Sequence, residues 1–311
     1  MAELENQQPQ QQAVVYIPDN TRKKSSQKKN KRIANTIIYI ILSIMTVVWL
    51  MPFVFIVIES FREFPTGNTG NPFFAIGGAE YQWGFGNYAR LFTETRFGGW
   101  FLNTVIIALA VAVLQTVIVL CMSYTLSRSR FKGRKLLMNA MLVIGMFPGF
   151  LTLLVLYNIL KDLGLTQENA VPGLILVYVA SSGMGYHVSK GFFDTVPKAL
   201  DEAARIDGAN RAQVLYKIIL PMAKPIVIYT ILTAFMAPWG DFIFAQYVAM
   251  GSQEGFNVAV GLWSWLGLSM ISDYYTLFCA GGVVVAIPVT LLFMFLQKYY
   301  VEGVTGGAVK G

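Results

Sequence analysis

Few side chains that could carry chemistry fall inside the apolar stretches of this 311-residue chain. Asp241 is the one carboxylate there, and it must face a protein interior or a wet cavity. Pro238 and Gly240 break the same stretch, so Asp241 is expected either to bond the backbone that they free or to contact a substrate hydroxyl. Trp239 and Tyr229 are aromatic candidates for the same substrate pathway, with core or lipid packing as the alternative.

The remaining residues give little support for an enzymatic function. Ser182 and His187 suggest an intramembrane serine protease, but Ala180 replaces the leading glycine of the motif. A histidine five residues along the same helix is also badly placed to activate the hydroxyl. ATP hydrolysis by this chain is excluded because no Gly-x-x-x-x-Gly-Lys-Ser/Thr sequence is present to cradle phosphates. We expect no catalytic residue, no bound cofactor and no metal site.

The most informative segment is polar and rich in helix punctuation. Residues 191–224 read GFFDTVPKALDEAARIDGANRAQVLYKIILPMAK. Pro197 suits the first turn of a helix, and Gly208 is placed to end that helix in a left-handed conformation. Between them, Asp201 and Arg205 are spaced to pair at i and i+4. The pattern predicts a short amphipathic helix that ends in a tight turn.

A second helix is predicted directly after that turn. Asn210 with Gln213 resembles a capping box, and Pro221 is expected to stop the helix. On the first helix, Ala203 and Ala204 share one side, and their small size would let the cleft of another protein close around it. The segment is therefore predicted to be a rigid knob that a partner protein binds.

Composition places these features in a membrane protein. The chain is 55% hydrophobic and 13% charged, with a mean hydropathy of +0.53, which is too apolar for one soluble core. The net charge of +7 comes from short segments between apolar runs, which does not indicate a nucleic-acid-binding domain. Six stretches approach the roughly 20 residues that span a bilayer: Ala34–Ile58, Phe101–Leu126, Leu136–Leu160, Ala170–Val188, Pro225–Met250 and Tyr274–Gln297. The predicted fold is an all-α bundle of six transmembrane helices.

Charge asymmetry sets the orientation of these spans. If the N-terminus is cytoplasmic, 20 of the 24 Lys and Arg residues fall on the cytoplasmic side, as loops retained there require. Both termini are then cytoplasmic. We expect a disordered basic arm over residues 1–32 with no cleaved signal peptide, a transmembrane domain over 33–297 and a tail over 298–311. The outer loops are expected either to contact an extracellular partner or to anchor aromatic rings at the membrane interface.

The knob also resembles a known motif. Its pattern is similar to the EAA signature of binding-protein-dependent ABC importer permeases, on Glu202, Ala203, Ala204, Asp207, Gly208, Ala209, Ile218, Leu220 and Pro221. The resemblance implies a type I importer permease fold, in which this loop is the coupling helix and sits in a groove of a separate ATPase. It also implies that Ala203 and Ala204 pack in that groove, that Gly208 makes the turn, and that Glu202 bonds at the rim. ATP and Mg²⁺ would then be bound by the partner ATPase.

A second resemblance narrows the family to sugar permeases of the maltose-transporter type. The segment GFFDTVPK, the break Met146-Phe147-Pro148-Gly149 and the C-terminus from Tyr300 are similar to the MalG-like subunit, and the similarity runs from about residue 33 to the end. It implies a contact of the tail with the ATPase, through Gly306, Gly307, Lys310 and Gly311. It also implies that Gln253 to Trp265 reach an extracytoplasmic binding protein. The fifth span departs from the family pattern at Pro238-Trp239-Gly240-Asp241, which leaves the role of Asp241 open.

Together these observations predict the permease subunit of an ATP-driven sugar importer in a bacterial cell membrane. The expected partners are a second, MalF-like permease, two copies of an ABC ATPase, a sugar-binding protein and membrane lipid, with no nucleic acid. An importer for a different small solute is one alternative. A proton-coupled secondary transporter is the other, although it would need several intramembrane Asp, Glu or His residues, and the spans hold only Asp241 and His187.

Overall fold

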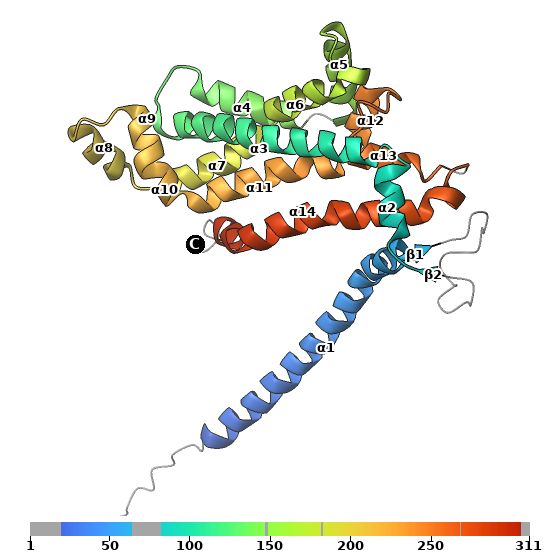
Figure 1. The fold of residues 1–311 in the computed structure, drawn as a ribbon. Helices are drawn as coiled ribbons and strands as arrows, with labels where there is room; N and C mark the ends of the chain where they lie inside the picture. Colours follow the sequence, from blue (N-terminus) through green and yellow to red (C-terminus); the bar gives the residue numbers. More distant parts are fainter. Residues whose placement is uncertain (1–19, 64–81, 147–148, 182, 268, 306–311) are drawn as a thin grey trace, which may run out of the picture. The chain divides into compact units, whose positions relative to one another are not determined.

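The computed structural model describes residues 20–63, 82–146, 149–181, 183–267 and 269–305, and most of them are helical (Figure 1). The chain divides into two units, Met1–Phe55 and Ile56–Gly311.

The first unit contains most of helix α1, Asn20–Ser60. The apolar part of this helix, Lys31–Ser60, is long enough to cross a membrane and covers the first predicted span, Ala34–Ile58. Helix α1 begins at Asn20, within the arm expected to be disordered, because neither proline nor glycine interrupts the chain between Asn20 and Pro52. The rest of the arm, residues 1–19, lies outside the described residues.

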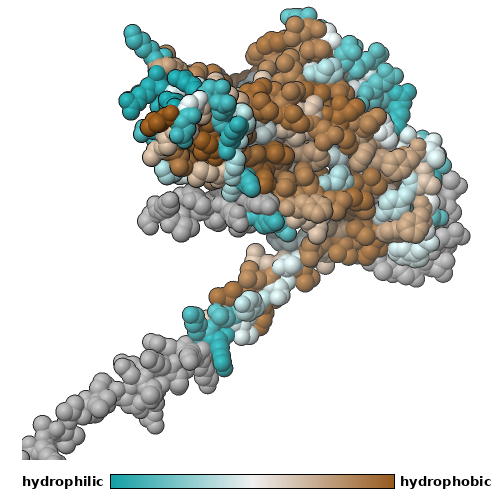
Figure 2. Space-filling view, turned by 60° about the vertical axis from the view of Figure 1, so that its left-hand side comes forward, coloured by the Kyte–Doolittle hydropathy of each residue, from teal (hydrophilic) through white to brown (hydrophobic). Residues whose placement is uncertain are grey.

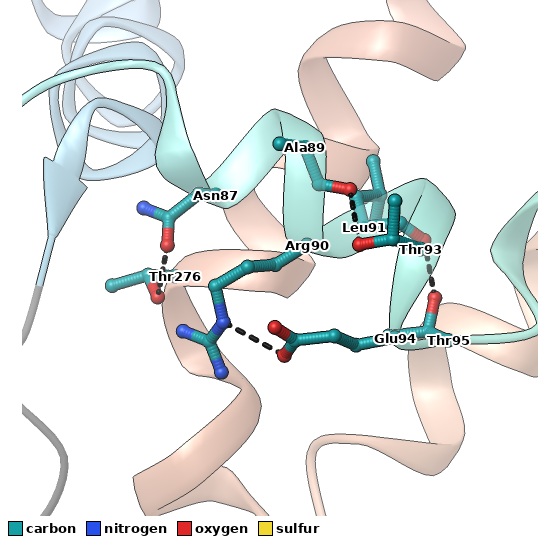
Figure 3. Close-up of polar contacts among 8 residues, drawn as sticks. All are labelled: Asn87, Ala89, Arg90, Leu91, Thr93, Glu94, Thr95 and Thr276. Atoms are coloured by element: carbon teal, nitrogen blue, oxygen red, sulfur yellow. Dashed lines mark hydrogen bonds and ion pairs between the residues drawn. The ribbon is translucent and has the colours of Figure 1, made fainter.

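A small polar assembly follows the end of α1. Strands β1, Arg62–Glu63, and β2, Gln82–Trp83, pair antiparallel, and helix α2 runs from Gly86 to Thr93. The buried amide of Asn87 donates to the carbonyls of Ser60 and Arg62, at 3.0 and 2.9 Å. Its oxygen accepts from Thr276, at 3.3 Å, as Figure 3 shows. The buried side chain of Asn87 thus joins α2 to the segment at Ser60 and Arg62 and to Thr276.

The remaining elements form the helical bundle of the second unit. In chain order they are α3 (Phe97–Arg128), α4 (Arg134–Gly145), α5 (Gly149–Asp162), η1 (Gln167–Asn169), α6 (Ala170–Ala180), α7 (Gly183–Thr195), α8 (Lys198–Ile206), α9 (Arg211–Gln213), η2 (Val214–Ile219), α10 (Leu220–Met222), α11 (Lys224–Gly240), α12 (Ile243–Ala249), α13 (Val258–Ser264) and α14 (Ile271–Thr305). Helix α3 lies at the centre, where it packs against α6, α7, α11 and α13, and α11 also packs against α14. The space-filling view shows a broad hydrophobic surface over the bundle, with hydrophilic residues gathered toward its ends (Figure 2). Such a surface is suited to lipid.

Four described helical stretches are long and apolar enough to cross a membrane: Lys31–Ser60, Phe97–Arg128, Gln167–Thr195, which comprises η1, α6 and α7, and Asp273–Lys298. A fifth span results if Arg211–Met222 and Lys224–Gly240, which meet at an angle of 89°, are counted as one. The predicted third span, Leu136–Leu160, is divided between α4 and α5, which have 12 and 14 residues and are each too short to cross alone. The chain is therefore a multi-pass membrane protein, while the count of six spans stays a prediction.

The predicted fifth span, Pro225–Met250, is also interrupted, because α11 ends at Gly240 and α12 begins at Ile243. Buried Asn257 closes this interruption. Its amide donates to the carbonyls of Pro238 and Asp241, at 3.1 and 2.8 Å, and its oxygen accepts the amide hydrogen of Val260 at the start of α13, at 2.9 Å. Two carbonyls at the interruption therefore have partners inside the protein, as a break at membrane depth requires.

Replacing Asn257 with Ala should lower the free energy of unfolding by about 2–4 kcal/mol, because buried groups that lose a partner cost about 1–3 kcal/mol each and relax in part. The measurement is the thermal unfolding midpoint of the purified protein in detergent. Asn158→Ala is the matched control, since exposed Asn158 makes only a 3.1 Å bond to the carbonyl of Leu154 within its own helix. Equal shifts for the two variants would contradict this account of the break.

Candidate functional site

The end of helix α8 has the geometry that the sequence predicts. Gly208 has φ of +85°, in the left-handed region, as expected. The amide of Ala209 donates to the carbonyl of Ala204 at 2.9 Å, and the amide of Gly208 donates to that of Arg205 at 3.1 Å. These two bonds form a Schellman motif, which closes the helix without any side-chain cap. The turn at the tip of the knob is therefore rigid.

The second helix of the knob begins as predicted but ends differently. Asn210 and Gln213 form a reciprocal capping box, with bonds of 2.9 and 2.8 Å. Pro221 does not stop the helix, which continues to Met222 before the 89° bend into α11. Pro221 has no amide hydrogen to donate to the hydrogen-bond ladder of an α-helix. The π-helical turn η2, which ends at Ile219, has wider hydrogen-bond spacing than an α-helix and comes just before this position.

Asp201 pairs differently from the prediction. The prediction that Asp201 pairs with Arg205 is wrong, because the carboxylate of Asp201 lies 2.8 Å from Nε of Arg128, at the end of α3. Both side chains are almost fully buried, with 3% of Arg128 and 8% of Asp201 exposed. Arg128 also donates to the carbonyl of Val196, at 2.8 Å. Pro197 then stands as the N-cap of α8, one position before the first turn. A buried ion pair thus ties the knob to α3.

The two alanines of the knob have different surroundings. Ala203 is exposed, as a docking role requires. The prediction that Ala204 packs in a partner's groove is wrong, because Ala204 is buried within this chain. It belongs to a cluster that joins α3, α7, α8, η2 and α11: Leu120, Tyr124, Phe193, Val196, Ala204, Val214, Ile219, Ala223 and Ile226. The inner side of α8 is therefore used to hold the knob on the bundle.

The outer side of α8 presents both charged and apolar residues. Glu202 and Asp207 are exposed, as the predicted rim and turn positions require. Ile206 is 87% exposed, and we did not single it out from the sequence. The signal in the sequence was a large apolar residue at the end of the predicted helix, next to the polar turn. A large apolar residue so exposed beside a turn indicates a protein contact. Of the other predicted residues of the motif, Ala209 is half-buried and Pro221 is exposed.

The outer loop predicted to reach a binding protein is held firmly by the bundle. The carbonyl of Gln253 accepts from the indole of Trp100, at 3.0 Å, and that of Glu254 accepts from Asn103, at 2.8 Å. Trp265 is buried, while the side chains of Gln253, Glu254 and Trp263 are exposed. The loop therefore offers only part of its length to a partner. The predicted ATPase contact at Gly306–Gly311 lies outside the described residues and stays a prediction.

Two of the three residues predicted to lie on a substrate pathway, Trp239 and Asp241, are held by contacts within this chain. Trp239 is buried against Phe101 and Phe235, with ring centroids 5.6 and 5.8 Å away, which favours the alternative of core packing. The carboxylate of Asp241 accepts from the phenol of Tyr178 and, at 3.1 Å, from the amide of Phe244. These bonds favour the structural alternative for Asp241, which fastens the break between α11 and α12 to α6.

Tyr229, the third of them, lines a cavity of about 360 Å³, called here the Tyr229 cavity. Helices α3, α4, α7 and α11 contribute to its wall, together with the residue that follows α6. The lining residues are Gln115, Val119, Gly145, Ser181, Gly185, Tyr229, Thr230, Thr233, Ala234 and Ala237. The polar members other than Tyr229 were missed from the sequence, because isolated Ser, Thr and Gln in apolar runs carry no motif. Trp239 and Asp241 are not among the described lining residues.

Comparison with known proteins identifies the family. A family model described as "Binding-protein-dependent transport system inner membrane component" matches residues 119–306. The chain belongs to this family. It is 36% identical to the maltodextrin transport system permease protein MdxG of Bacillus subtilis, over 88% of this chain and 95% of the relative. It is 34% identical to the maltodextrin permease MalD of Streptococcus pneumoniae, over 92% and 99% of the two chains.

The fold agrees with this assignment. A chain of a bacterial ABC transporter that imports the acidic polysaccharide alginate matches 87% of this permease and 98% of its own length, with a TM-score of 0.69 and 21% identity. The family comprises permease subunits of ABC transporters, in which a separate subunit hydrolyses ATP. The permease is therefore a non-catalytic membrane component, as the sequence predicts.

Breaking the buried pair on one side should destabilise this permease. Asp201→Ala leaves Arg128 buried without its partner, and removing one member of such a pair costs about 3–5 kcal/mol. The readout is thermal unfolding in detergent. The control is Glu94→Ala, which removes the exposed 2.9 Å pair with Arg90 (Figure 3) and should cost less than about 1 kcal/mol. The assignment of Asp201 as an anchor fails if the two losses are alike.

Proposed function

We propose that this permease is one of two transmembrane subunits of an ATP-driven oligosaccharide importer in a bacterial cell membrane. Its similarity to two maltodextrin permeases over most of both chains supports the sugar class. A binding protein outside the membrane delivers the sugar, and an ABC ATPase inside powers the passage. ATP and Mg²⁺ bind to that ATPase, and this chain holds no cofactor.

The geometry of the knob is the observation that carries the proposal. Helix α8 exposes Ala203 and Ile206 on one side and is fixed to the bundle on the other. The buried pair of Asp201 with Arg128 joins it to α3, and the cluster around Ala204 joins it to α7 and α11. A protein that binds the exposed side and moves would therefore move the ends of three helices together. This is the mechanical requirement for coupling ATP hydrolysis to transport.

The proposed topology has six spans with both termini in the cytoplasm. The third span is α4 with α5, and the fifth is α11 with α12, each crossing the membrane as a broken helix. Broken helices are tolerated at membrane depth where protein or a cavity surrounds the break. The clustering of Lys and Arg on one side supports the orientation, which places the knob and the tail at the cytoplasmic face with the ATPase.

A second permease subunit completes the assembly. One stripe of apolar side chains along α3 is exposed on this chain: Leu102, Ile106, Leu109, Val113 and Val117. The stripe recurs every three or four residues, so it occupies one face of the helix. Lipid and a homologous, MalF-like permease are the two neighbours that such a face suits. Two ATPase copies would then bind, one to the knob of each permease.

Ala203→Arg tests the docking role. The residue is exposed, so this chain should insert and fold as before, while a bulky cation in the contact should lower ATP-dependent uptake by at least about tenfold. Uptake and ATP hydrolysis are measured in vesicles that contain the complete transporter. Ala89→Arg, on an exposed alanine of α2, is the control and should leave both rates unchanged. Full ATP-dependent uptake by Ala203→Arg would show that the knob does not couple the two subunits.

A further inference from the structure

We propose that the cavity between the end of α3 and the start of α4 binds the phosphate headgroup of an anionic phospholipid. This cavity, called here the α4 pocket, has a volume of about 590 Å³, which is within the range of small-molecule sites. Its described lining includes three cations, Arg130, Arg134 and Lys135, and no carboxylate. The proposed transport function gives this pocket no role, so the inference goes beyond that function.

The α4 pocket lies in the short connection between two apolar helices. The helix Phe97–Arg128, which is long and apolar enough to cross a membrane, ends two residues before Arg130. Helix α4 then begins at Arg134, and the predicted third span starts at Leu136. Basic residues just beyond the end of a span lie at the level of the lipid headgroups. The three cations are therefore at the depth where lipid phosphates lie.

The positive charge of the pocket is not neutralised within this chain. Among the described residues, no ion pair includes Arg130, Arg134 or Lys135. The charge of Arg134 also acts on Asp194 of α7, but that carboxylate is already paired with Lys190. Arginine matches the oxygens of a phosphate with two parallel hydrogen bonds, and lysine adds a point charge. An anion with phosphate oxygens is the ligand that this lining favours.

The first turn of α4 adds hydrogen-bond donors to these charges. Its N-cap, Gly133, has no side chain that could bond the free amides of the turn. The amide of Leu137 donates to the carbonyl of Gly133, at 2.9 Å. The amides of Lys135 and Leu136, which come before it, have no partner among the described contacts. Such amides bind phosphate oxygens, and the helix dipole favours the negative charge.

Apolar side chains beside the cations indicate a lipid and not a free phosphate. Phe131 and Leu136 line the pocket, and both are exposed, with 75% of Leu136 accessible. Val143 is also exposed and lies two helical turns after Leu136, so the two share one face of α4. Acyl chains can lie along this face while the headgroup occupies the pocket. A free phosphate would leave these apolar side chains uncovered.

Photolabelling of the complete transporter tests the site. A photoreactive phosphatidylglycerol is added to the detergent-purified complex of both permeases and the ATPase, and peptide mass spectrometry measures the label on residues 129–146. Unlabelled phosphatidylglycerol should compete at about tenfold lower concentration than phosphatidylcholine, because only its headgroup has a net negative charge. Arg130→Gln and Lys135→Gln, combined in one variant, should weaken its binding about thirtyfold, or roughly fivefold for each cation. Both side chains are exposed, so the fold should be retained.

The matched control combines Arg96→Gln with Lys161→Gln. It removes the same charge from two exposed residues, one directly before α3 and one in the last turn of α5, and should leave the labelling unchanged. Arg130→Lys covers the case in which the charge loss prevents insertion. It keeps the charge but loses the paired hydrogen bonds to phosphate, so binding should still weaken a few-fold.

Four results would overturn the proposal. Equal competition by phosphatidylcholine would show an ordinary lipid contact without headgroup recognition. Stronger competition by sodium phosphate than by sodium chloride of the same ionic strength would show a site for free phosphate. No label on residues 129–146 of the complete transporter would show that another subunit covers the pocket. Unchanged binding in both Arg130→Lys and the double variant would show that these cations do not hold the headgroup.

Discussion

Every backbone amide and carbonyl that enters a bilayer must find its hydrogen-bond partner inside the protein, and this constraint accounts for four polar residues at the helix breaks of the bundle. The permease interrupts its helices within predicted spans, and each interruption frees backbone groups. Asn257 and Asp241 satisfy those between α11 and α12. Gln115 and Ser181 both donate to the carbonyl of Tyr178 in the last turn of α6. These four polar residues thus bond backbone at the broken helices.

Burial then decides which caps can also contact a substrate. Asn257 is fully buried, and half-buried Asp241 is held by Tyr178 and by backbone, so the polar groups at that break already have partners within the protein. The break after α6 instead opens on the Tyr229 cavity, where Ser181 is exposed. The same backbone requirement therefore produces a break with paired polar groups between α11 and α12 and a polar pocket after α6. A lone carboxylate in a span is no guide to the pathway when its oxygens already have partners.

The parts that could be predicted from sequence are those determined by neighbours along the chain. The turn at Gly208 and the capping box at Asn210 each depend on residues within a few positions, and both predictions are confirmed. The partner of Asp201 could not be predicted, because Arg128 lies on another helix and only tertiary packing brings it within 2.8 Å. Ala204 fails for the same reason, since the spacing on a helix defines a face but not which neighbour covers it.

The proposed docking knob and the Tyr229 cavity are joined structurally through α11. Its first turns belong to the cluster that holds the knob, through Ile226, while Thr230 and Thr233 of the same helix line the cavity. The helical run before α11 contains a π-helical turn and meets α11 at 89°. If that run shifts along its own axis, it therefore pushes α11 sideways. A lateral shift of α11 would change the width of the cavity without unwinding a helix. The buried pair of Asp201 with Arg128 makes the alternative, in which the knob moves alone, energetically unfavourable, because a separated buried charge costs several kcal/mol.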